Sequence, residues 1–330
     1  KWQSVTVPHD WAIYGPFSSL NDKQEVAISQ DGQKEAMEHA GRTGGLPFVG
    51  VGWYRTEFDV PQFQAGKRAT ILFDGAMSHA NVYINGQKVG YWPYGYNSFH
   101  FDITKYLKPG EKNTLAVRLE NLPESSRWYP GAGLYRNVHL IITEDAYIPV
   151  WGTYITTPSV NEKFAKVNVR TKVVLPEGAD PAKYSVETSV WNPNKQKLTA
   201  VRTSLAQMKY NNNQAEQEFV IQAPSLWSPE MPALYSAETR LYEGDKLKDI
   251  YTTPFGIRSI EIIPDKGFFL NGKRTVFKGV CNHHDLGPLG AAVNDAAIRR
   301  QIRILKDMGC NAIRTSHNMP CLLYTSDAAD

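Results

Sequence analysis

The chain has 330 residues, of which 42% are hydrophobic and 21% charged, and its formal net charge is only +3. This composition is typical of a globular protein with two or three domains, and it excludes a disordered chain or a strongly basic nucleic-acid binder. No stretch approaches the ~20 consecutive apolar residues of a membrane-spanning helix. We therefore expect neither nucleic acid nor a membrane as a partner. The aromatic content of 12% suits sandwich cores or surfaces that contact the apolar faces of sugars.

The two ends of the chain and its cysteines leave the cellular compartment open. The sequence begins Lys1-Trp2-Gln3, without Met and without the apolar core of a signal peptide, so we expect the natural N-terminus to be missing. The three cysteines, at positions 281, 310 and 321, come late in the chain and are odd in number. They do not form the spacing of a disulfide or metal framework.

The first part of the chain, up to residue 147, is predicted to be a jelly-roll β-sandwich. Runs rich in β-branched and aromatic residues predict strands at 69–73, 99–103, 114–119 and 137–142. Residues 82–84 and 87–92 flank Asn85-Gly86, whose residue types accept the positive φ values of a tight type I′ turn, so they predict a hairpin. Residues 18–50 are polar and Gly-rich without a strand period, which predicts a long loop.

Residues 148–257 are predicted to form a second sandwich. Strand-like runs at 165–174, 184–191, 216–221 and 234–242 are separated by turns such as Asn192-Pro193-Asn194. A seven-stranded immunoglobulin-like sandwich of ~100 residues fits this span.

The pattern changes in the third segment, residues 258–320, to strand, helix and strand. The run 275–280 predicts a strand, and a helix follows with Asn294 as its N-cap and Gly309 just past its end. The apolar face of that helix carries Ile298, Ile302, Leu305 and Met308. The next strand is predicted at 312–315. A strand, a helix and a second strand joined by a short connection form a βαβ unit, in which the two strands are parallel and the crossover is right-handed.

Polar side chains follow both predicted parallel strands where working residues of such folds cluster. The first set is Asn282-His283-His284-Asp285, and the second is Ser316-His317-Asn318, preceded by Arg314. Imidazole, amide and carboxylate groups together supply the donors and acceptors that sugar hydroxyls need. The alternative for a single histidine is a capping or core role. A zinc site is the weaker interpretation, because His283 and His284 are adjacent and point apart.

These motifs in this order resemble glycoside hydrolase family 2, and within it the bacterial β-galactosidases. The resemblance runs from the first residues to Pro320 and rests on five segments: residues 8–11 (PHDW), 133–136 (GLYR), 255–258 (FGIR), 277–285 (FKGVCNHHD) and 311–320 (NAIRTSHNMP). It implies a jelly-roll sugar-binding domain, an immunoglobulin-like domain and the first βαβ unit of a truncated (β/α)8 barrel. It also implies retaining hydrolysis by two carboxylates. Their glutamates follow barrel strands four and seven, so this chain, which reaches strand two, carries no catalytic residue.

The resemblance also assigns roles near the sugar. It implies that His317 steadies the sugar in the transition state and that Arg314 supports the catalytic carboxylates. It places His284 and Asp285 along the same pocket, although Glu is common where Asp285 stands. We expect the remaining substrate-binding contacts from Asn282, Asn318, Arg127 and Trp128, the last two on a sandwich loop that reaches the barrel mouth.

Some residues of these motifs are expected to serve other purposes. Some family members have an aspartate near Arg127 that helps to bind sodium, so the sodium site is not carried over to this guanidinium. Arg127 stacked on Trp128 to rigidify a corner is the structural alternative. His9, Asp10 and Trp11 are expected to be structural, because they open the first domain well before the barrel.

For the intact protein, the resemblance implies β-galactoside saccharides as partners. It leaves magnesium or sodium as candidate ions, although no cofactor or metal site is visible in the sequence. A homo-oligomer and either the periplasm or the cytoplasm of a bacterium also stay open. The alternatives are a β-glucuronidase or β-mannosidase of the same family, and, outside it, a non-catalytic carbohydrate-binding sandwich protein. Residues 321–330 leave the family pattern and resemble a translated sequencing adaptor, so we expect them to be an artefact of the library.

Overall fold

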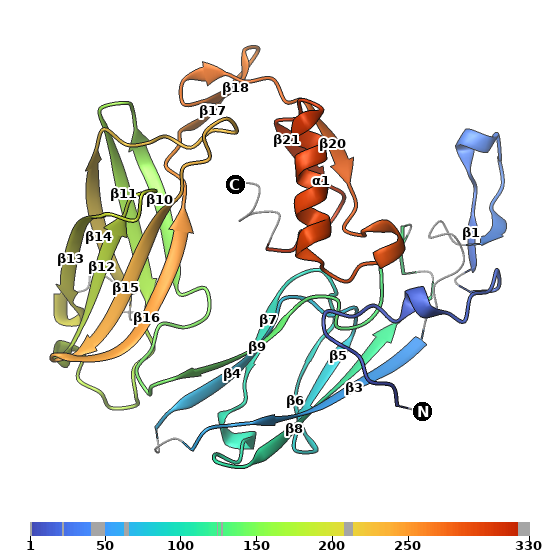
Figure 1. The fold of residues 1–330 in the computed structure, drawn as a ribbon, viewed down its shortest axis with the longest axis horizontal. Coiled ribbons are helices and arrows are strands. Elements are labelled where there is room, and N and C mark those ends of the chain that lie inside the picture. Colours follow the sequence, from blue (N-terminus) through green and yellow to red (C-terminus); the bar gives the residue numbers. More distant parts are fainter. Residues whose placement is uncertain are drawn as a thin grey trace. The chain divides into compact units, whose positions relative to one another are not determined.

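The computed structural model describes residues 2–21, 23–40, 50–62, 66–123, 125–126, 128–207 and 214–322. They form two compact units (Figure 1). Unit 1 combines the chain up to Ile142 with the residues from Gly279 onward. Unit 2 holds Thr143–Lys278, together with the short segment Gly66–Arg68.

The sandwich of unit 1 has a four-stranded and a three-stranded sheet. The first has the order β3 (Gly50–Asp59), β8 (Lys112–Asn121), β5 (Ala80–Ile84), β6 (Gln87–Trp92), and the second has the order β7 (Phe99–Asp102), β4 (Arg68–Phe73), β9 (Val138–Thr143). Alternate residues of β4 and β8 are buried, which directs one face of each sheet into a common core. Phe73 and Phe99 stack in that core with ring centroids 4.8 Å apart. The predicted hairpin is confirmed, because Asn85 and Gly86 have φ values of 51° and 80° and join β5 to β6.

The prediction of a continuous loop over residues 18–50 is wrong. The strands β1 (Lys23–Val26) and β2 (Met37–Ala40) pair antiparallel within it, with the short 3₁₀ helix η2 (Ser29–Asp31) between them. Polar residues build this ribbon, including an ion pair between Lys23 and Glu38, so it lacks the hydrophobic alternation that marks a strand in sequence. The glycine-rich residues 41–45 lie outside the described residues.

The predicted βαβ unit is confirmed and belongs to unit 1. Strand β20 (Gly279–Asn282) pairs in parallel with β21 (Ala312–Thr315), and helix α1 (Asp295–Asp307) connects them. The Asn294 side chain accepts a 3.0 Å hydrogen bond from the Ala297 amide, as an N-cap does. Two details of the prediction are wrong. Met308 does not belong to the buried face of the helix, because the last turn ends before this residue can pack, and Met308 is instead the exposed C-cap. The first strand begins at Gly279 and not at residue 275.

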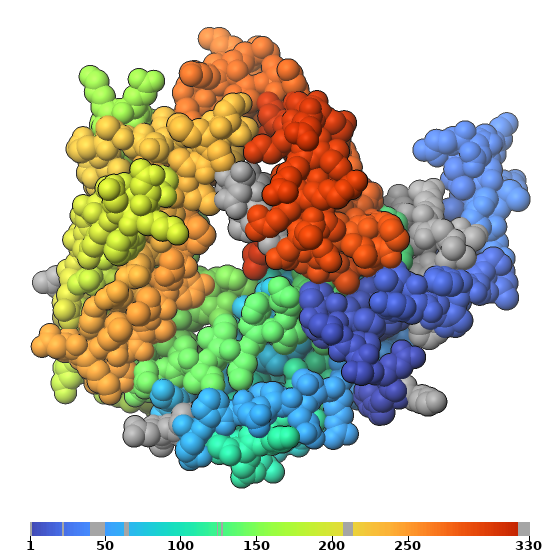
Figure 2. All heavy atoms as spheres, viewed as in Figure 1, coloured from blue at the N-terminus to red at the C-terminus, as the bar shows by residue number. Residues whose placement is uncertain are grey.

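The described part of unit 1 has three further 3₁₀ helices: η1 (Ala12–Tyr14), η3 (Thr104–Tyr106) and η6 (Gly287–Leu289). The segment with η1 lies against the β20–α1 connection. There the Ala291 amide donates to an Asp10 carboxylate oxygen at 2.8 Å. In Figure 2 the dark-blue N-terminal segment accordingly touches the red C-terminal one.

Unit 2 is the predicted immunoglobulin-like sandwich. Its sheets have the orders β10 (Thr153–Val160), β11 (Phe164–Lys172), β14 (Gln214–Gln222) and β13 (Lys197–Ser204), β12 (Tyr184–Trp191), β15 (Tyr235–Glu243), β16 (Lys246–Phe255). The 3₁₀ helices η4 (Pro181–Lys183) and η5 (Leu205–Gln207) lie in its connections. A small sheet follows, made of β17 (Ile260–Ile263), β18 (Gly267–Leu270) and β19 (Lys273–Arg274).

Candidate functional site

The parallel pairing of β20 and β21 sets two polar segments side by side. Asn282 lies opposite Thr315 in the register, so the chain leaves both strands at the same level. The Ser316 amide donates to the Asn282 carbonyl at 2.8 Å and holds the two exits together. We call the group formed by Trp128, Asn282–Asp285 and Arg314–Asn318 the strand-end site. Its position at the carboxyl ends of parallel strands is the one predicted from sequence.

Three aromatic rings meet at the centre of this site. Trp128, on the sandwich loop that follows β8, lies 5.1 Å from His317 and 5.5 Å from His283 between ring centroids. The two imidazoles meet edge to face at 5.5 Å. The Trp128 indole donates to the Tyr96 hydroxyl at 3.1 Å, which fixes the plane of the indole. The sandwich and the βαβ unit therefore contribute rings to one cluster.

The proton positions of His317 follow from its neighbour. An Arg314 terminal nitrogen lies 3.4 Å from His317 Nδ1. Because a guanidinium can only donate, Nδ1 must accept, and the proton of the neutral ring is then on Nε2. Arg314 also donates to the Cys281 thiol sulfur at 3.6 Å, and this contact lowers the pKa of that exposed thiol.

His284 does not share the ring cluster of His283 and His317. Its Nε2 donates to the Pro130 carbonyl at 2.9 Å, and its ring meets Tyr96 edge to face at 5.1 Å. Burial lowers the pKa of His284, so the ring is held neutral with Nδ1 unprotonated. His284 therefore packs between the βαβ unit and the sandwich and contacts both. Whether it also touches a sugar, as the resemblance implies, stays a prediction.

The amide and hydroxyl groups of the site are only partly satisfied. Asn318 Oδ1 accepts from the Tyr94 hydroxyl at 2.7 Å. Buried polar atoms without a hydrogen-bond partner among the described residues gather here: Asn282 Nδ2, His283 Nδ1, His284 Nδ1, Ser316 Oγ and Asn318 Nδ2. Such atoms are rare in folded proteins and call for further partners. This clustering is what a site for a polar ligand requires.

Asp10 is a residue whose importance the sequence did not reveal. Its carboxylate is 1% exposed and accepts from the Ala12 and Ala132 amides, both at 3.0 Å. It also accepts from the Ala291 amide at 2.8 Å and from the Tyr129 hydroxyl at 2.6 Å. One buried carboxylate thus ties the loop that carries Trp128 to the loop between β20 and α1. The expectation that residues 9–11 are structural agrees with these bonds, but Asp10 also shapes the site.

Arg136 is the second residue that sequence reasoning missed. It is 3% exposed, and its guanidinium donates to the carbonyls of Met319 at 2.8 Å and of Tyr96 at 3.0 Å. The first bond holds the segment after His317 against the sandwich. The available signal was an arginine directly after the apolar residues Leu134 and Tyr135, because an arginine that is buried with such neighbours needs partners.

Arg127 and Asp285 are the last two residues expected at this site. Arg127 lies outside the described residues, and Asp285 lies near Tyr129, whose pKa rises through burial and through the charges of Asp10 and Asp285. Within the described ranges, no group of three or more His, Cys, Asp or Glu side chains is arranged to hold a metal ion. None of the helices described is both long enough and apolar enough to cross a membrane.

Family models match three consecutive segments of the chain. The model for the sugar-binding domain of glycosyl hydrolases family 2 matches residues 46–144, and the model described as glycosyl hydrolases family 2 matches residues 147–258. The model for the TIM barrel domain of the same family matches residues 261–324.

Individual relatives are similar over nearly the whole chain. The β-galactosidase BoGH2A of Bacteroides ovatus is 42% identical over 97% of the chain, and a β-glucuronidase of Bacteroides fragilis is 34% identical over 85%. A crystal structure of a family 2 member from Bacteroides cellulosilyticus superposes with a TM-score of 0.87 at 34% identity, over 99% of this chain and 41% of that one. The chain spans only 36% and 42% of the two curated relatives.

Proposed function

The chain belongs to glycosyl hydrolase family 2, and from this premise we propose that the protein of which it is part removes terminal β-galactosyl residues by retaining hydrolysis. The observation that carries this proposal is the strand-end site, which combines contacting aromatic rings and imidazoles with amide nitrogens that have no hydrogen-bond partner among the described residues. A sugar ring needs an aromatic surface for its C–H face and both donors and acceptors for its hydroxyls.

We infer roles for the site residues from their contacts. Trp128 supplies the apolar surface. His317 presents an Nε2–H donor, because its Nδ1 accepts a hydrogen bond from Arg314. Asn318 keeps its amide nitrogen for a sugar hydroxyl, because its oxygen already accepts from Tyr94. We assign Asn282 and Asp285 to the outer part of the same site, as the resemblance implies.

The choice of a neutral sugar is supported by the charges near the site. A glucuronide would need a cation that is available for its carboxylate. Of the two guanidinium groups that the structure describes near the site, that of Arg136 is committed to carbonyl groups and that of Arg314 is bound to His317 and Cys281, whereas Arg127 lies outside the described residues. The relative with 42% identity is named a β-galactosidase, which agrees with this argument. The β-glucuronidase named at 34% identity supplies the second candidate function.

The two catalytic carboxylates are proposed to come from later barrel strands. A retaining glycosidase needs an acid/base and a nucleophile about 5 to 5.5 Å apart. Asp10 cannot serve, because its oxygens are committed to four hydrogen bonds. We assign these roles to glutamates after barrel strands four and seven, so the 330-residue chain alone should not hydrolyse a glycoside.

Two measurements test this proposal. The gene downstream of the codon for Pro320 should encode an Asn-Glu pair at strand four and a second Glu at strand seven. The protein encoded by that complete gene should then hydrolyse a chromogenic β-galactoside faster than the matching β-glucuronide. The reverse preference would establish the glucuronidase instead. Turnover of the galactoside by the purified 330-residue chain, abolished by His317→Ala, would show that the assignment of the carboxylates is wrong.

A further inference from the structure

A tyrosine to which the sequence assigned no role joins the sandwich of unit 1 to the strand-end site. Tyr94 lies in the segment 93–98 between β6 and β7 and is 45% exposed. Its hydroxyl donates to Asn318 Oδ1 at 2.7 Å, 224 positions further along the chain. A side chain with almost half of its surface exposed contributes less to the hydrophobic core than a buried one. The hydrogen bond to Asn318 is therefore the feature of Tyr94 that needs an explanation.

The backbone on both sides of Tyr94 is held by other parts of the sandwich. The Pro93 carbonyl accepts from the His79 amide at 3.1 Å, and the Gly95 carbonyl accepts from the Tyr135 hydroxyl at 2.7 Å. These bonds fix the point from which the Tyr94 side chain extends. A side chain that starts from a fixed backbone loses less conformational entropy when it orders a partner.

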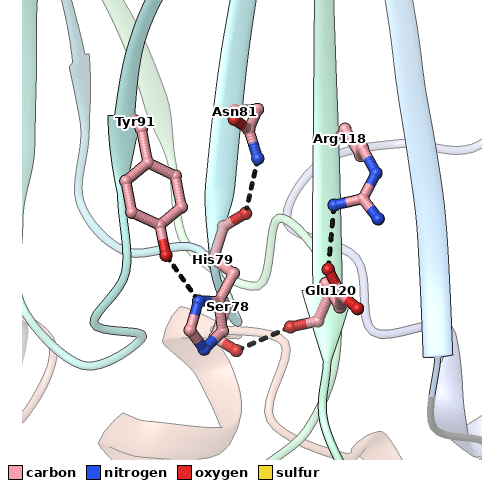
Figure 3. Close-up of polar contacts among 6 residues, drawn as sticks. All are labelled: Ser78, His79, Asn81, Tyr91, Arg118 and Glu120. Carbon is pink, nitrogen blue, oxygen red and sulfur yellow. Dashed lines mark hydrogen bonds and ion pairs between the residues drawn. The ribbon is translucent and has the colours of Figure 1, made fainter.

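The His79 amide belongs to a corner of the chain that is itself bound to β8 (Figure 3). The Ser78 hydroxyl donates to the Glu120 carbonyl at 2.8 Å, and the Glu120 amide donates back to the Ser78 carbonyl at 2.9 Å. Glu120 is the last residue but one of β8, the strand that leads into the loop carrying Trp128. One corner therefore holds both the start of the Tyr94 segment and the start of the Trp128 loop.

Arg136 links the backbone near Tyr94 to the backbone near Asn318. Its guanidinium donates to the Tyr96 carbonyl at 3.0 Å and to the Met319 carbonyl at 2.8 Å. The two segments are thus held together by a buried side chain as well as by the more exposed bond from Tyr94 to Asn318. The bond from the Tyr94 hydroxyl is consequently not needed to bring the segments together, and it acts on the amide group itself.

The Tyr94 hydroxyl decides which end of the Asn318 amide is bound to the sandwich. Oδ1 accepts from this hydroxyl, whereas Nδ2 has no hydrogen-bond partner among the described residues. An amide group has an acceptor at one end and a donor at the other, and the two ends have nearly the same shape. Without the Tyr94 hydroxyl the amide can turn over, and its oxygen then takes the place of the donor.

We propose that Tyr94 is a positioning residue for the glycosidase activity, whose hydroxyl fixes the Asn318 amide with Nδ2 as the donor for a substrate hydroxyl. The role rests on the proposed function, in which Asn318 binds a hydroxyl of the sugar. Tyr94 acts through Asn318 and not on the sugar. The sandwich thereby sets the orientation of a polar group that the βαβ unit carries.

The test is a double-mutant cycle in the complete enzyme, measured as kcat/KM with the β-glycoside that it hydrolyses fastest. Tyr94→Phe should lower kcat/KM about tenfold, which corresponds to one hydrogen bond of ~1.4 kcal/mol. Asn318→Ala should lower it at least as much. In the Asn318→Ala background, Tyr94→Phe should change kcat/KM less than about twofold, because the group that Tyr94 positions is gone.

The matched control is Tyr91→Phe. Tyr91 on β6 is 46% exposed, and its hydroxyl contacts the His79 ring at 2.6 Å within the sandwich (Figure 3). Removal of this equally exposed hydroxyl should change kcat/KM less than about twofold. Circular dichroism establishes that each variant is folded.

Monodeoxy versions of the same glycoside give a readout that a merely structural role of Tyr94 would not change. Each version lacks one sugar hydroxyl. For the version without the hydroxyl that Asn318 binds, Tyr94→Phe should have no effect on kcat/KM, whereas the other versions should show the tenfold loss.

Three results would overturn the proposal. They are losses that add in the double variant, an equal effect of Tyr94→Phe on every monodeoxy glycoside, and a loss in Tyr91→Phe as large as that in Tyr94→Phe. A complete enzyme that prefers a β-glucuronide overturns the proposed galactosidase activity instead. The cycle is then measured with that glucuronide, so the failure of one proposal is distinguishable from the failure of the other.

Discussion

Replacement of Asp10 by Asn tests the most consequential contact that the structure adds to the sequence. The carboxylate accepts four hydrogen bonds, two on each oxygen, and is 1% exposed. The amide of Asn has the same shape but only one oxygen. Whichever way it is turned, an N–H group must face two donors.

The less costly orientation places the amide nitrogen beside Ala291 and Tyr129. The Tyr129 hydroxyl can then turn and accept, but the Ala291 amide is left without an acceptor, at a cost of about 1 to 3 kcal/mol. The two bonds to the remaining oxygen change from charge-assisted to neutral, which weakens each by about 1 kcal/mol. We expect Asp10→Asn to lower the free energy of unfolding of unit 1 by about 3 to 5 kcal/mol, a large part of a typical domain's ~5 to 15 kcal/mol.

Hydrogen exchange measured by mass spectrometry resolves this effect along the chain. Peptides of unit 1, above all those containing Ala132 and Ala291, should lose protection, whereas peptides of unit 2 should not. The matched control is Asp180→Asn, an exposed side chain that accepts from the Ala182 amide at 3.0 Å. Asn caps as well as Asp, so this control should change stability by less than ~0.5 kcal/mol. A change below ~1 kcal/mol in unit 1 for Asp10→Asn would refute the reasoning.

Three further predictions concern unit 1, each checked by urea unfolding. Gly131→Ala should lower the free energy of unfolding by at least ~2 kcal/mol more than Gly178→Ala does. Both glycines have φ above +70°, but a methyl group at position 131 would meet the Ala291 side chain, whereas nothing lies near Gly178. Equal losses in the two variants would contradict this. Because burial lowers the pKa of His284, the folded unit binds fewer protons than the unfolded chain, so stability should be lost as the pH falls below the ordinary value of 6.5, and His284→Gln should flatten that dependence. Asn294→Ala should lower the free energy of unfolding by ~1 kcal/mol. Asn294→Ser should lower it by only a few tenths of a kcal/mol, because Ser also caps helices. A similar loss in both variants would argue against the capping role.

Local patterns in the sequence were enough to predict the architecture. Alternating apolar residues define which face of a strand is buried, and the Asn85-Gly86 pair has the residue types of a tight turn, so both sandwiches could be predicted without a structure. The meeting of residues 282–285 with 314–318 was also predictable, because parallel strands bring their carboxyl ends to one edge. The ribbon of β1 and β2 was not predicted, because its strands are mostly polar and lack the alternation of apolar residues.

The partners of the polar side chains were decided only by the tertiary structure. Asp10 and the Ala291 amide are 281 positions apart, and no spacing rule links them. Likewise, His283 and His284 are adjacent, yet one joins Trp128 and the other is buried against Tyr96. Periodicity encodes how much of a residue is buried, but a hydrogen bond depends on where distant segments of the chain come to lie. The sequence therefore determined which segments build the site, and the packing of sandwich against βαβ unit decided which atoms face a ligand.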